Sequence, residues 1–238
     1  MIPEIRSENS PKAAEAQRAV QRMVQVKICG ITNLDDARAA IEAGADMLGF
    51  NFYRPSPRFI EPAKARRVIE ALRGEVGATP APTMVGVFVN EGSPEAVADI
   101  VHEAGLSAVQ LHGDESIDSC AATKQLLSGK LLIKVLRVTD AFEPSETQRY
   151  DADAIMLDAF HREMRGGTGQ VIDWTMARRA RELVPRLFLA GGLSPENVAE
   201  AIARVGPFAV DACSSLETEP GQKDAGRMRA FVRAARNG

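Results

Sequence analysis

Side chains that can transfer protons follow several short apolar runs of this chain. A thiol, Cys29, two carboxyl groups, Asp158 and Asp211, and an imidazole, His112, hold such positions, and Gln110 precedes His112 by two residues. Thiols, carboxyl groups and imidazoles are common general acids and bases once their surroundings adjust their pKa values. The pattern therefore indicates acid–base chemistry at the ends of buried strands.

Turns suited to binding an anion follow other apolar runs. Glycine lets backbone N–H groups approach a ligand closely, and N–H groups gathered at such turns bind phosphate. One of these loops, residues 166–169, is long enough to act as a lid that adds N–H donors. The candidate phosphate-binding residues are Gly191, Gly192, Ser214, Ser215, Gly167 and Gly169.

Eight apolar runs alternate with stretches of helical periodicity. Most runs are too short for helices and are rich in Val, Ile, Leu and Phe, which favours buried strands. Between them, apolar residues recur at i, i+3, i+4 and i+7, so the connections are predicted to be helices with one buried face. The runs are Val24–Ile28, Met47–Phe52, Met84–Val89, Ala108–Leu111, Leu131–Val138, Ala154–Leu157, Leu187–Leu189 and Phe208–Val210.

Capping residues mark the predicted helix boundaries. A polar side chain or a proline at the first turn suits the unpaired N–H groups there, and glycine suits the end of a helix. The predicted starts are at Asn33, Glu61–Pro62, Ser93–Pro94 and Ser194–Pro195. The predicted ends are at Gly44, Gly74 and Gly105.

Nearly continuous apolar strands that alternate with helices are typical of parallel strands joined by right-handed crossovers. Eight such units predict a single-domain α/β fold, a (β/α)8 TIM barrel with eight parallel strands and outer helices, over residues 23–238. An open doubly wound sheet is the alternative, but its GxGxxG fingerprint is absent. Residues 1–22 are expected to form an N-terminal extension that is either a helix or disordered. In TIM barrels the chemistry lies at the carboxyl ends of the strands, where the polar residues above occur.

The composition is that of an ordinary globular protein. The 238 residues include 29 Lys+Arg and 32 Asp+Glu, a formal net charge of −3, and 45% are hydrophobic. No basic block could follow a nucleic-acid backbone and no apolar stretch reaches the ~18 residues of a membrane span, so neither partner is expected. The three cysteines, Cys29, Cys120 and Cys213, lie far apart without ligand spacing. This predicts no metal site and a reducing, cytoplasmic location.

A set of motifs follows in a familiar order from Met23 to the C-terminus. The motifs are VKICGIT at 26–32, GADMLGFNFY at 44–53, SPR at 56–58, VGVFVN at 85–90, VQLHGDE at 109–115, LDAF at 157–160, GGTG at 166–169, GGLSPENV at 191–198 and PGQKD at 220–224. In these segments the chain resembles phosphoribosylanthranilate isomerase of tryptophan biosynthesis. The resemblance implies an Amadori rearrangement of N-(5′-phosphoribosyl)anthranilate to 1-(2-carboxyphenylamino)-1-deoxyribulose 5-phosphate, without a cofactor. It also implies a small phosphorylated substrate, and it leaves open whether the protein is a monomer or a homodimer.

The implied reaction needs an acid for the ring oxygen, a base for the C2 proton, and groups that bind a phosphate and a carboxylate. By resemblance, Cys29 is the base, Asp158 is the acid, and Arg58 binds the anthranilate carboxylate through its guanidinium fork. Lys27 precedes Cys29 by two residues and faces the same side of the strand, where a cation would favour the thiolate. Without the surrounding motif, the commonest interpretation of Cys29 would be a buried, inert thiol.

Three further residues are assigned to substrate binding. Gln110 and His112 alternate with apolar neighbours, so both are expected to face the lumen as positioning groups. Asp211 is either a neighbour that raises the pKa of Asp158, a ligand of the substrate's amino nitrogen, or a cap of the following turn.

The turn after the last strand departs from the family pattern DVSSGVE. Residues 211–217 read DACSSLE, so Cys213 replaces the first Ser and Ser215 replaces the Gly. Ser214 and backbone N–H groups are therefore expected to carry more of the phosphate contact than the side chain of Cys213.

Two other functions fit the same barrel. Another sugar-phosphate isomerase or synthase would share the phosphate loops. However, the related histidine-pathway isomerase has an Asp in place of Cys29, and indole-glycerol-phosphate synthase depends on a Lys and Glu set absent in this arrangement. A non-catalytic barrel would be expected to have lost the acid or the base, and both are present.

Overall fold

The computed structural model describes residues 23–75, 81–159 and 173–237, and every structural statement below concerns these residues. Eight parallel strands pair in chain order, and β8 pairs with β1 to close the barrel. The strands are β1 Gln25–Cys29, β2 Met47–Asn51, β3 Thr83–Phe88, β4 Ala108–Leu111, β5 Leu131–Val138, β6 Ala154–Ala159, β7 Leu187–Leu189 and β8 Ala209–Ala212. The predicted (β/α)8 TIM barrel is confirmed.

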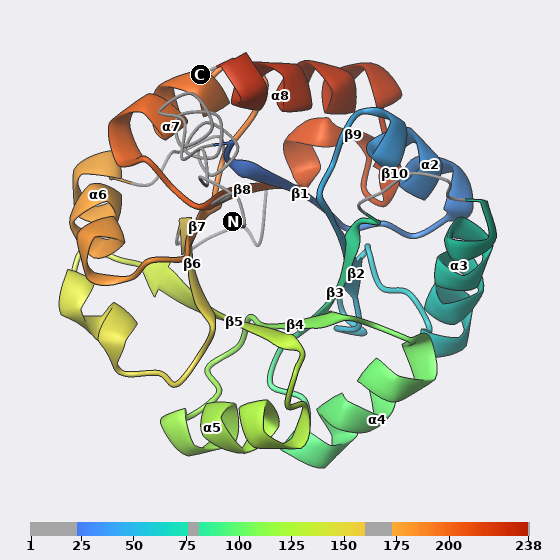
Figure 1. Cartoon of the computed structure of the whole chain (residues 1–238), viewed down its shortest axis with the longest axis horizontal. Helices are drawn as coiled ribbons and strands as arrows, with labels where there is room; N and C mark the ends of the chain where they lie inside the picture. The colour runs from blue at the N-terminus through green and yellow to red at the C-terminus, as the bar shows by residue number, and fades with distance from the viewer. Residues whose placement is uncertain (1–22, 76–80, 160–172, 238) are drawn as a thin grey trace, which may run out of the picture.

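Helices surround the ring of strands (Figure 1). They are α2 Leu34–Glu42, α3 Pro62–Glu75, α4 Pro94–Ala104, α5 Ile117–Leu126, α6 Trp174–Leu183, α7 Val198–Val205 and α8 Ala225–Asn237. Between β5 and β6 the chain forms only a short 3-10 helix, η1 Pro144–Gln148, where the repeat pattern predicts an α-helix. The extension predicted over residues 1–22 lies outside the described residues.

Most of the predicted helix-capping residues are confirmed. Asn33 and Ser93 accept hydrogen bonds from the N–H groups of Asp36 and Ala96, and α3 begins at Pro62 as expected. Gly105 ends α4 with φ +72°. The helix faces are also as predicted; in α8, for example, the buried residues are Met228, Phe231, Val232 and Ala235.

Two predicted helix boundaries are wrong. Gly74 lies inside the last turn of α3, which continues to Glu75. α7 begins at Val198 instead of Ser194–Pro195, because Ser194 starts a separate turn in which its N–H donates to the side chain of Asn197 at 2.8 Å. The same asparagine then precedes the helix as its N-cap residue.

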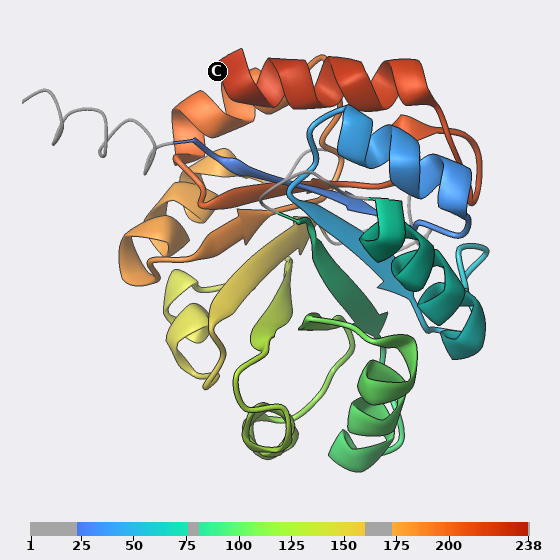
Figure 2. The same ribbon diagram turned by 45° about the vertical axis from the view of Figure 1, so that its right-hand side comes forward.

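The core consists of two apolar layers. One fills the space between the strands and the helices, and a smaller cluster, with Met156 and Phe188 among its members, fills the inside of the barrel. Several polar side chains are nevertheless buried, including Lys27, Gln110, Lys134 and Asp211. Figure 2 shows that the strands run side by side in one direction, so their carboxyl ends meet at one end of the barrel.

A small antiparallel hairpin lies between β8 and α8. Its strands are β9 Glu217–Glu219 and β10 Gln222–Lys223. Gly221 in its turn accepts a hydrogen bond from Thr32 at 2.7 Å, and the N–H of Lys223 donates to Asp36 at 3.0 Å. The hairpin is thereby fixed against the β1–α2 connection, close to the end of β1.

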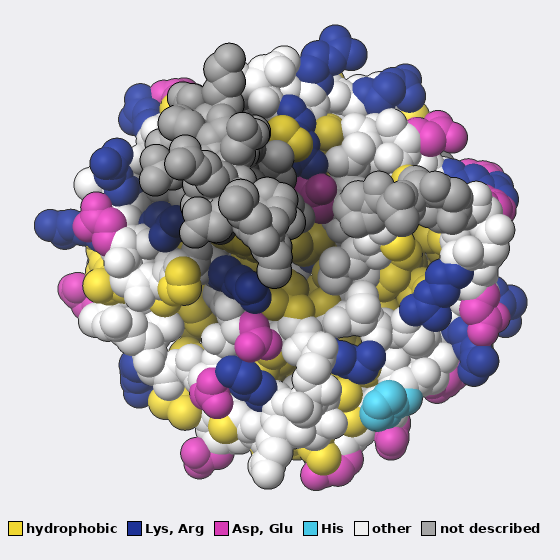
Figure 3. Space-filling model, in the orientation of Figure 1, with side chains coloured by type: hydrophobic (Ala, Val, Ile, Leu, Met, Phe, Trp, Pro, Cys, Tyr) yellow, Lys and Arg dark blue, Asp and Glu magenta, His cyan; other side chains and the backbone are white. Residues whose placement is uncertain are grey.

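On the face seen in Figure 3, apolar side chains gather near the centre, and side chains of both charges alternate around the periphery. Within the described ranges, no helix has the combination of length and apolar composition that a bilayer crossing requires.

Candidate active site

Cys29 ends β1, and its side chain is buried within the mouth of the barrel, with 9% of the residue exposed. Gly49 is its partner on β2. A Cβ atom at Gly49 would lie 2.8 Å from Cys29 Sγ, which is closer than real Cβ contacts, and 3.0 Å from Lys27 Nζ, which is tighter than most of them. The absence of a side chain at Gly49 therefore gives space to both groups, and Lys27 and Cys29 share one face as predicted.

Lys27 forms a buried ion pair with Asp211 of β8. Its Nζ lies 2.7 Å from Asp211 Oδ1, and the two residues are register partners across the β1–β8 seam. Burial raises the pKa of Asp211 to about 7, although Lys27 opposes this shift. Burial acts to lower the pKa of Lys27, but the charges of Asp211 and Cys29 outweigh it. Lys27 is therefore a permanent cation beside a carboxyl group that titrates near neutral pH.

Cys213 lies next to Cys29. The last register pair of β1 and β8 is Ile28↔Ala212, so Cys29, which ends β1, and Cys213, which directly follows β8, come next on the two neighbouring segments. A hydrogen bond from Cys213 lowers the pKa of Cys29 well below its ordinary value, against the effect of burial, and Lys27 and Lys223 add to the shift. The same bond raises the pKa of Cys213. Cys213 therefore lies beside Cys29, a position that the family pattern did not indicate.

His112 joins Gln110 to Asp158. Gln110 Nε2 lies 2.9 Å from His112 Nδ1, and His112 Nε2 lies 3.1 Å from Asp158 Oδ2. With the Gln110 amide donating to Nδ1, the imidazole proton is on Nε2 and is donated to the carboxylate. Both residues face the lumen, as the alternation of β4 predicts. Their arrangement fixes the orientation of Asp158 at the end of β6.

Arg58 forms a bidentate ion pair with Glu217 of β9. Arg58 Nε lies 2.9 and 3.1 Å from the two carboxylate oxygens, and Nη2 lies 2.7 Å from Oε2. Arg58 Nη1 has no acceptor within the described part of the chain. One edge of the guanidinium is therefore held by the protein, and the other edge remains available to a second carboxylate.

Lys223 of β10 shares the same carboxylate. Its Nζ lies 2.7 Å from Glu217 Oε1 and 3.2 Å from the carbonyl oxygen of Cys213. Burial opposes the ionisation of Glu217, but the hydrogen bonds from Arg58 and Lys223 outweigh it and lower its pKa. Glu217 and Lys223 are not among the site residues predicted from the sequence. The signal was present, because a Glu and a Lys that flank a Pro–Gly turn six positions apart can meet across a hairpin.

The turns after β7 and β8 lie together. Gly191 has φ +82°, and a Cβ atom there would come within 2.3 Å of Ala159 N and 2.9 Å of Asp158 Oδ1, so only glycine fits. Gly192 follows with φ +69°. Ser215 Oγ donates to the carbonyl oxygen of Leu193 at 2.6 Å and ties the second turn to the first.

Of the other predicted phosphate-binding residues, the structure describes Ser214 but not Gly167 and Gly169. Ser214 is exposed in the 3-10 helix η2 (Ser214–Leu216), and the next residue, Ser215, contacts the carbonyl oxygen of Leu193, which directly follows the Gly191–Gly192 turn. Gly167 and Gly169 lie outside the described residues. Within the described ranges, no group of three or more His, Cys, Asp or Glu side chains could hold a metal ion.

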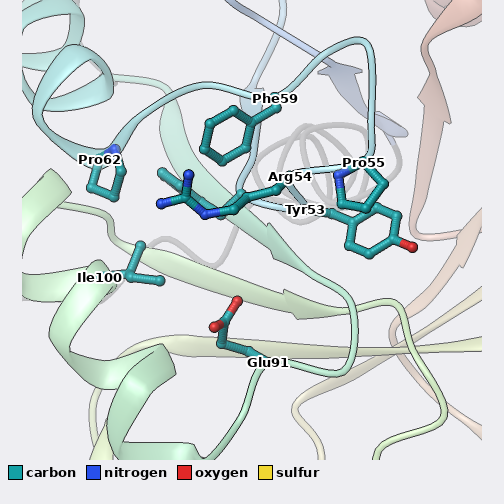
Figure 4. Close-up of a pocket in the computed structure, with 8 residues that line it drawn as sticks. Tyr53, Arg54, Pro55, Phe59, Pro62, Glu91 and Ile100 are labelled. Carbon is teal, nitrogen blue, oxygen red and sulfur yellow. The ribbon is translucent and has the colours of Figure 1, made fainter.

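A separate apolar pocket of about 240 Å³ lies between the loop after β2 and helices α3 and α4. Figure 4 shows that Arg54 extends beside the ring of Phe59, and its guanidinium carbon lies 5.2 Å from the ring centroid. Tyr53 and Pro55 also line the pocket, but Cys29 and Asp158 do not. The groups capable of acid–base chemistry lie in the barrel mouth, so we place the candidate active site there.

The chain is similar to known proteins over most of its length. A family model described as N-(5′-phosphoribosyl)anthranilate (PRA) isomerase matches residues 26–234. The N-(5′-phosphoribosyl)anthranilate isomerase of Trichlorobacter lovleyi is 44% identical over 214 residues, which cover 90% of this chain and 98% of that protein.

Solved structures agree with this similarity. The crystal structure of phosphoribosyl anthranilate isomerase from Thermotoga maritima has a TM-score of 0.78 and 39% identity, and covers 91% of this chain and 100% of its own. A structure of such an enzyme in complex with reduced 1-(o-carboxyphenylamino)-1-deoxyribulose 5-phosphate has a TM-score of 0.74 at 39% identity, with coverage of 91% and 100%. The chain therefore belongs to the N-(5′-phosphoribosyl)anthranilate isomerase family.

Proposed function

We propose that the protein converts N-(5′-phosphoribosyl)anthranilate to 1-(2-carboxyphenylamino)-1-deoxyribulose 5-phosphate, with Cys29 as the general base and Asp158 as the general acid. One observation carries the assignment of roles: a buried thiol with a lowered pKa and an oriented carboxyl group border the same barrel mouth. Asp211 connects them, since its carboxyl group interacts with the charges of both Cys29 and Asp158. A substrate held beside Asp211 would lie within reach of both groups.

The reaction begins with opening of the sugar ring. Asp158, in its protonated form, donates its proton to the ring oxygen while the bond between C1 and that oxygen breaks. The lone pair of the anthranilate nitrogen forms the C1=N bond as the ring opens. The hydrogen bond from His112 holds the Asp158 carboxyl group in position for this transfer, and Gln110 holds the imidazole.

The second step moves a proton from C2. The Cys29 thiolate removes this proton, and the electron pair of the C–H bond forms a C1=C2 double bond while the C1=N pair returns to nitrogen. The resulting enolamine tautomerises to the ketone. A thiol at its ordinary pKa would be mostly protonated at neutral pH, so the lowered pKa of Cys29 increases the fraction that can act as a base.

The substrate's two anionic groups would bind at opposite sides of the mouth. The free edge of Arg58 suits the planar anthranilate carboxylate, because Glu217 holds the guanidinium by its other edge. The phosphate would be bound by the adjoining turns at Gly191, Gly192 and Ser214, together with Gly167 and Gly169 of the loop that the structure does not describe. Asp211, next to Lys27, is the candidate partner of the substrate's amino nitrogen.

A fluorescence assay tests this function. Purified protein should consume the fluorescence of phosphoribosylanthranilate in the absence of any added cofactor. The Cys120→Ala variant is a suitable control, because Cys120 is buried in α5 outside the site and its pKa is raised to about 11 by burial. Turnover should be the same in this variant as in the wild type. Absence of turnover at micromolar concentrations of folded wild-type protein would refute the proposed function.

A further inference from the structure

Lys134 is a buried cation that the proposed mechanism does not use. It lies in β5 between Ile133 and Val135, which belong to the apolar cluster inside the barrel. Successive side chains of a strand point to opposite sides, so Lys134 points to the outside of the ring of strands. Its side chain is only 2% exposed. Because a buried charge is costly unless it is paired, the groups that pair with Lys134 indicate what this cation does.

The partners of Lys134 lie in the loop that follows β4. Its Nζ lies 2.6 Å from Glu115 Oε2 and donates a hydrogen bond to the carbonyl oxygen of Gly113 at 2.8 Å. The other carboxylate oxygen, Glu115 Oε1, accepts a hydrogen bond from the N–H of Gly113 at 3.0 Å. The ion pair therefore holds the peptide groups on both sides of Gly113, and the first of these joins Gly113 to His112.

The loop that follows β3 completes this arrangement. The N–H of Asn90 donates to Glu115 Oε1 at 3.0 Å, and Asn90 Oδ1 accepts from the N–H of Asp114 at 2.7 Å. A Cβ atom at Gly113 would lie 2.2 Å from Asn90 Oδ1 and 2.6 Å from Glu115 Oε1, so only glycine fits between these groups. The backbone that follows His112 is thus enclosed by two side chains and a neighbouring loop.

His112, whose backbone is fixed in this way, contacts the proposed general acid. Its own N–H donates to the carbonyl oxygen of Phe88 at 2.8 Å, and its Nε2 lies 3.1 Å from Asp158 Oδ2. The imidazole therefore approaches the carboxyl group from a backbone that is held on both sides. A displacement of about 1 Å in a group that orients a reaction can lower its rate by about 10²-fold, so this support bears on the chemical step.

We propose that Lys134 and Glu115 are positioning residues for the general acid: they fix the backbone at Gly113 and, through His112, the carboxyl group of Asp158. The inference rests on the proposed function, because it assigns the oriented carboxyl group a use in proton transfer. Lys134 points away from the lumen, so the pair acts through the imidazole and not on the substrate.

Kinetics of Lys134→Met, alone and combined with His112→Ala, test the inference. Met has a similar length but lacks the ammonium group, so kcat should fall by ~10-fold or more while KM stays within about twofold of the wild type. In the His112→Ala background the same substitution should change kcat by less than about twofold, because the side chain through which the pair acts is absent. Equal losses of kcat in the two backgrounds would overturn the inference.

Arg236→Met is the matched control. Like Lys134, Arg236 joins a carboxylate to a backbone carbonyl: its Nη2 lies 2.6 Å from Asp46 Oδ2, and its Nη1 donates to the carbonyl oxygen of Val24. Asp46 likewise accepts a backbone hydrogen bond, from the N–H of Val26 at 2.7 Å. These groups lie at the beginning of β1, at the other end of the barrel from the site. The control should therefore lose stability and keep its kcat, and a loss of kcat equal to that in Lys134→Met would overturn the inference.

A second variant covers the case in which Lys134→Met does not fold because Glu115 is left unpaired. Lys134→Met/Glu115→Gln removes both charges and keeps an oxygen that can accept from the N–H groups of Asn90 and Gly113. The carbonyl oxygen of Gly113 still loses its donor, so the same loss of kcat is expected, again only when His112 is present. Wild-type kcat in this folded variant would overturn the inference.

Nuclear magnetic resonance of the ring nitrogens of His112 separates this inference from the proposed function, because it requires no turnover. The signals are assigned by their absence from His112→Ala. They should shift or broaden in Lys134→Met and keep their wild-type positions in Arg236→Met, and unchanged signals in folded Lys134→Met would overturn the inference. Failure of the proposed function would instead appear as absence of turnover in the folded wild-type protein.

Discussion

Replacement of Glu217 by Gln should both destabilise the protein and weaken substrate binding. Glu217 accepts hydrogen bonds from Arg58 at 2.7 to 3.1 Å and from Lys223 at 2.7 Å, and its side chain is 3% exposed. Gln has a similar shape, but it removes the negative charge and directs an NH2 group at a cationic donor. Two buried cations then lack their counterion.

The expected magnitude follows from the burial of the partners. Removal of one partner of a buried ion pair costs about 3–5 kcal/mol. Arg58 keeps 15% exposure, so water partly solvates one of the two cations and the lower end of that range applies. We therefore expect urea denaturation to give a free energy of unfolding about 3 kcal/mol lower in Glu217→Gln than in the wild type.

Glu75→Gln provides a matched comparison. Glu75 also binds an arginine through two oxygens, with Arg38 Nε at 2.8 Å and Nη2 at 2.5 Å, but both side chains are more than 40% exposed. Since exposed ion pairs contribute little, this variant should remain close to the wild type in stability. The reasoning is refuted if Glu217→Gln and Glu75→Gln lose equal amounts of stability, or if KM is unchanged in Glu217→Gln.

Three other variants test separate parts of the site. Asp211 retains a proton up to about pH 7 in the folded protein but ionises near 3.8 when unfolded, so unfolding releases a proton between these values and stability should fall as pH rises from about 4 to 7. Thermal melts at several pH values measure this dependence, which should be lost in Asp211→Asn. If stability varies with pH in the variant as steeply as in the wild type, the raised pKa does not belong to Asp211. Gly49→Ala places a methyl group 2.8 Å from Cys29 Sγ, so kcat should fall by at least ~10-fold and the free energy of unfolding by about 1–3 kcal/mol. Wild-type kinetics in the folded variant would show that the site can accommodate the methyl group. Arg58→Ala should raise KM by ~10–100-fold in steady-state assays with a smaller change in kcat. A large fall in kcat with little change in KM would instead assign Arg58 to the chemical step.

Local sequence patterns predict much of the fold because burial of whole strands leaves a clear signal. The predicted runs Ala108–Leu111, Leu131–Val138 and Leu187–Leu189 coincide with β4, β5 and β7. The errors occur where a local signal for a helix boundary has another outcome. At Ser194 the side chain of Asn197 stabilises a turn before the helix, and Gly74 does not adopt the positive φ of a helix-ending glycine, so α3 continues to Glu75.

The contacts within the site were harder to predict. The positions of Cys29, Asp158, His112 and Gln110 follow from strand ends and alternation, because parallel strands bring their carboxyl ends together. The pairing of Arg58 with Glu217 joins residues 159 positions apart and depends on how the β9–β10 hairpin is fixed. Likewise, the raised pKa of Asp211 results mainly from its depth in the barrel, which no local pattern encodes.

The central claim is that a thiolate and a carboxyl group act from two sides on one bound sugar phosphate. Single-turnover rates in Cys29→Ala and Asp158→Ala, compared with the affinity of each variant for a product analogue, test it most directly. We predict that each substitution lowers the rate by ~10²–10⁴-fold while the affinity stays within about threefold of the wild type. A Cys29→Ala enzyme that turns over at the wild-type rate would contradict the claim.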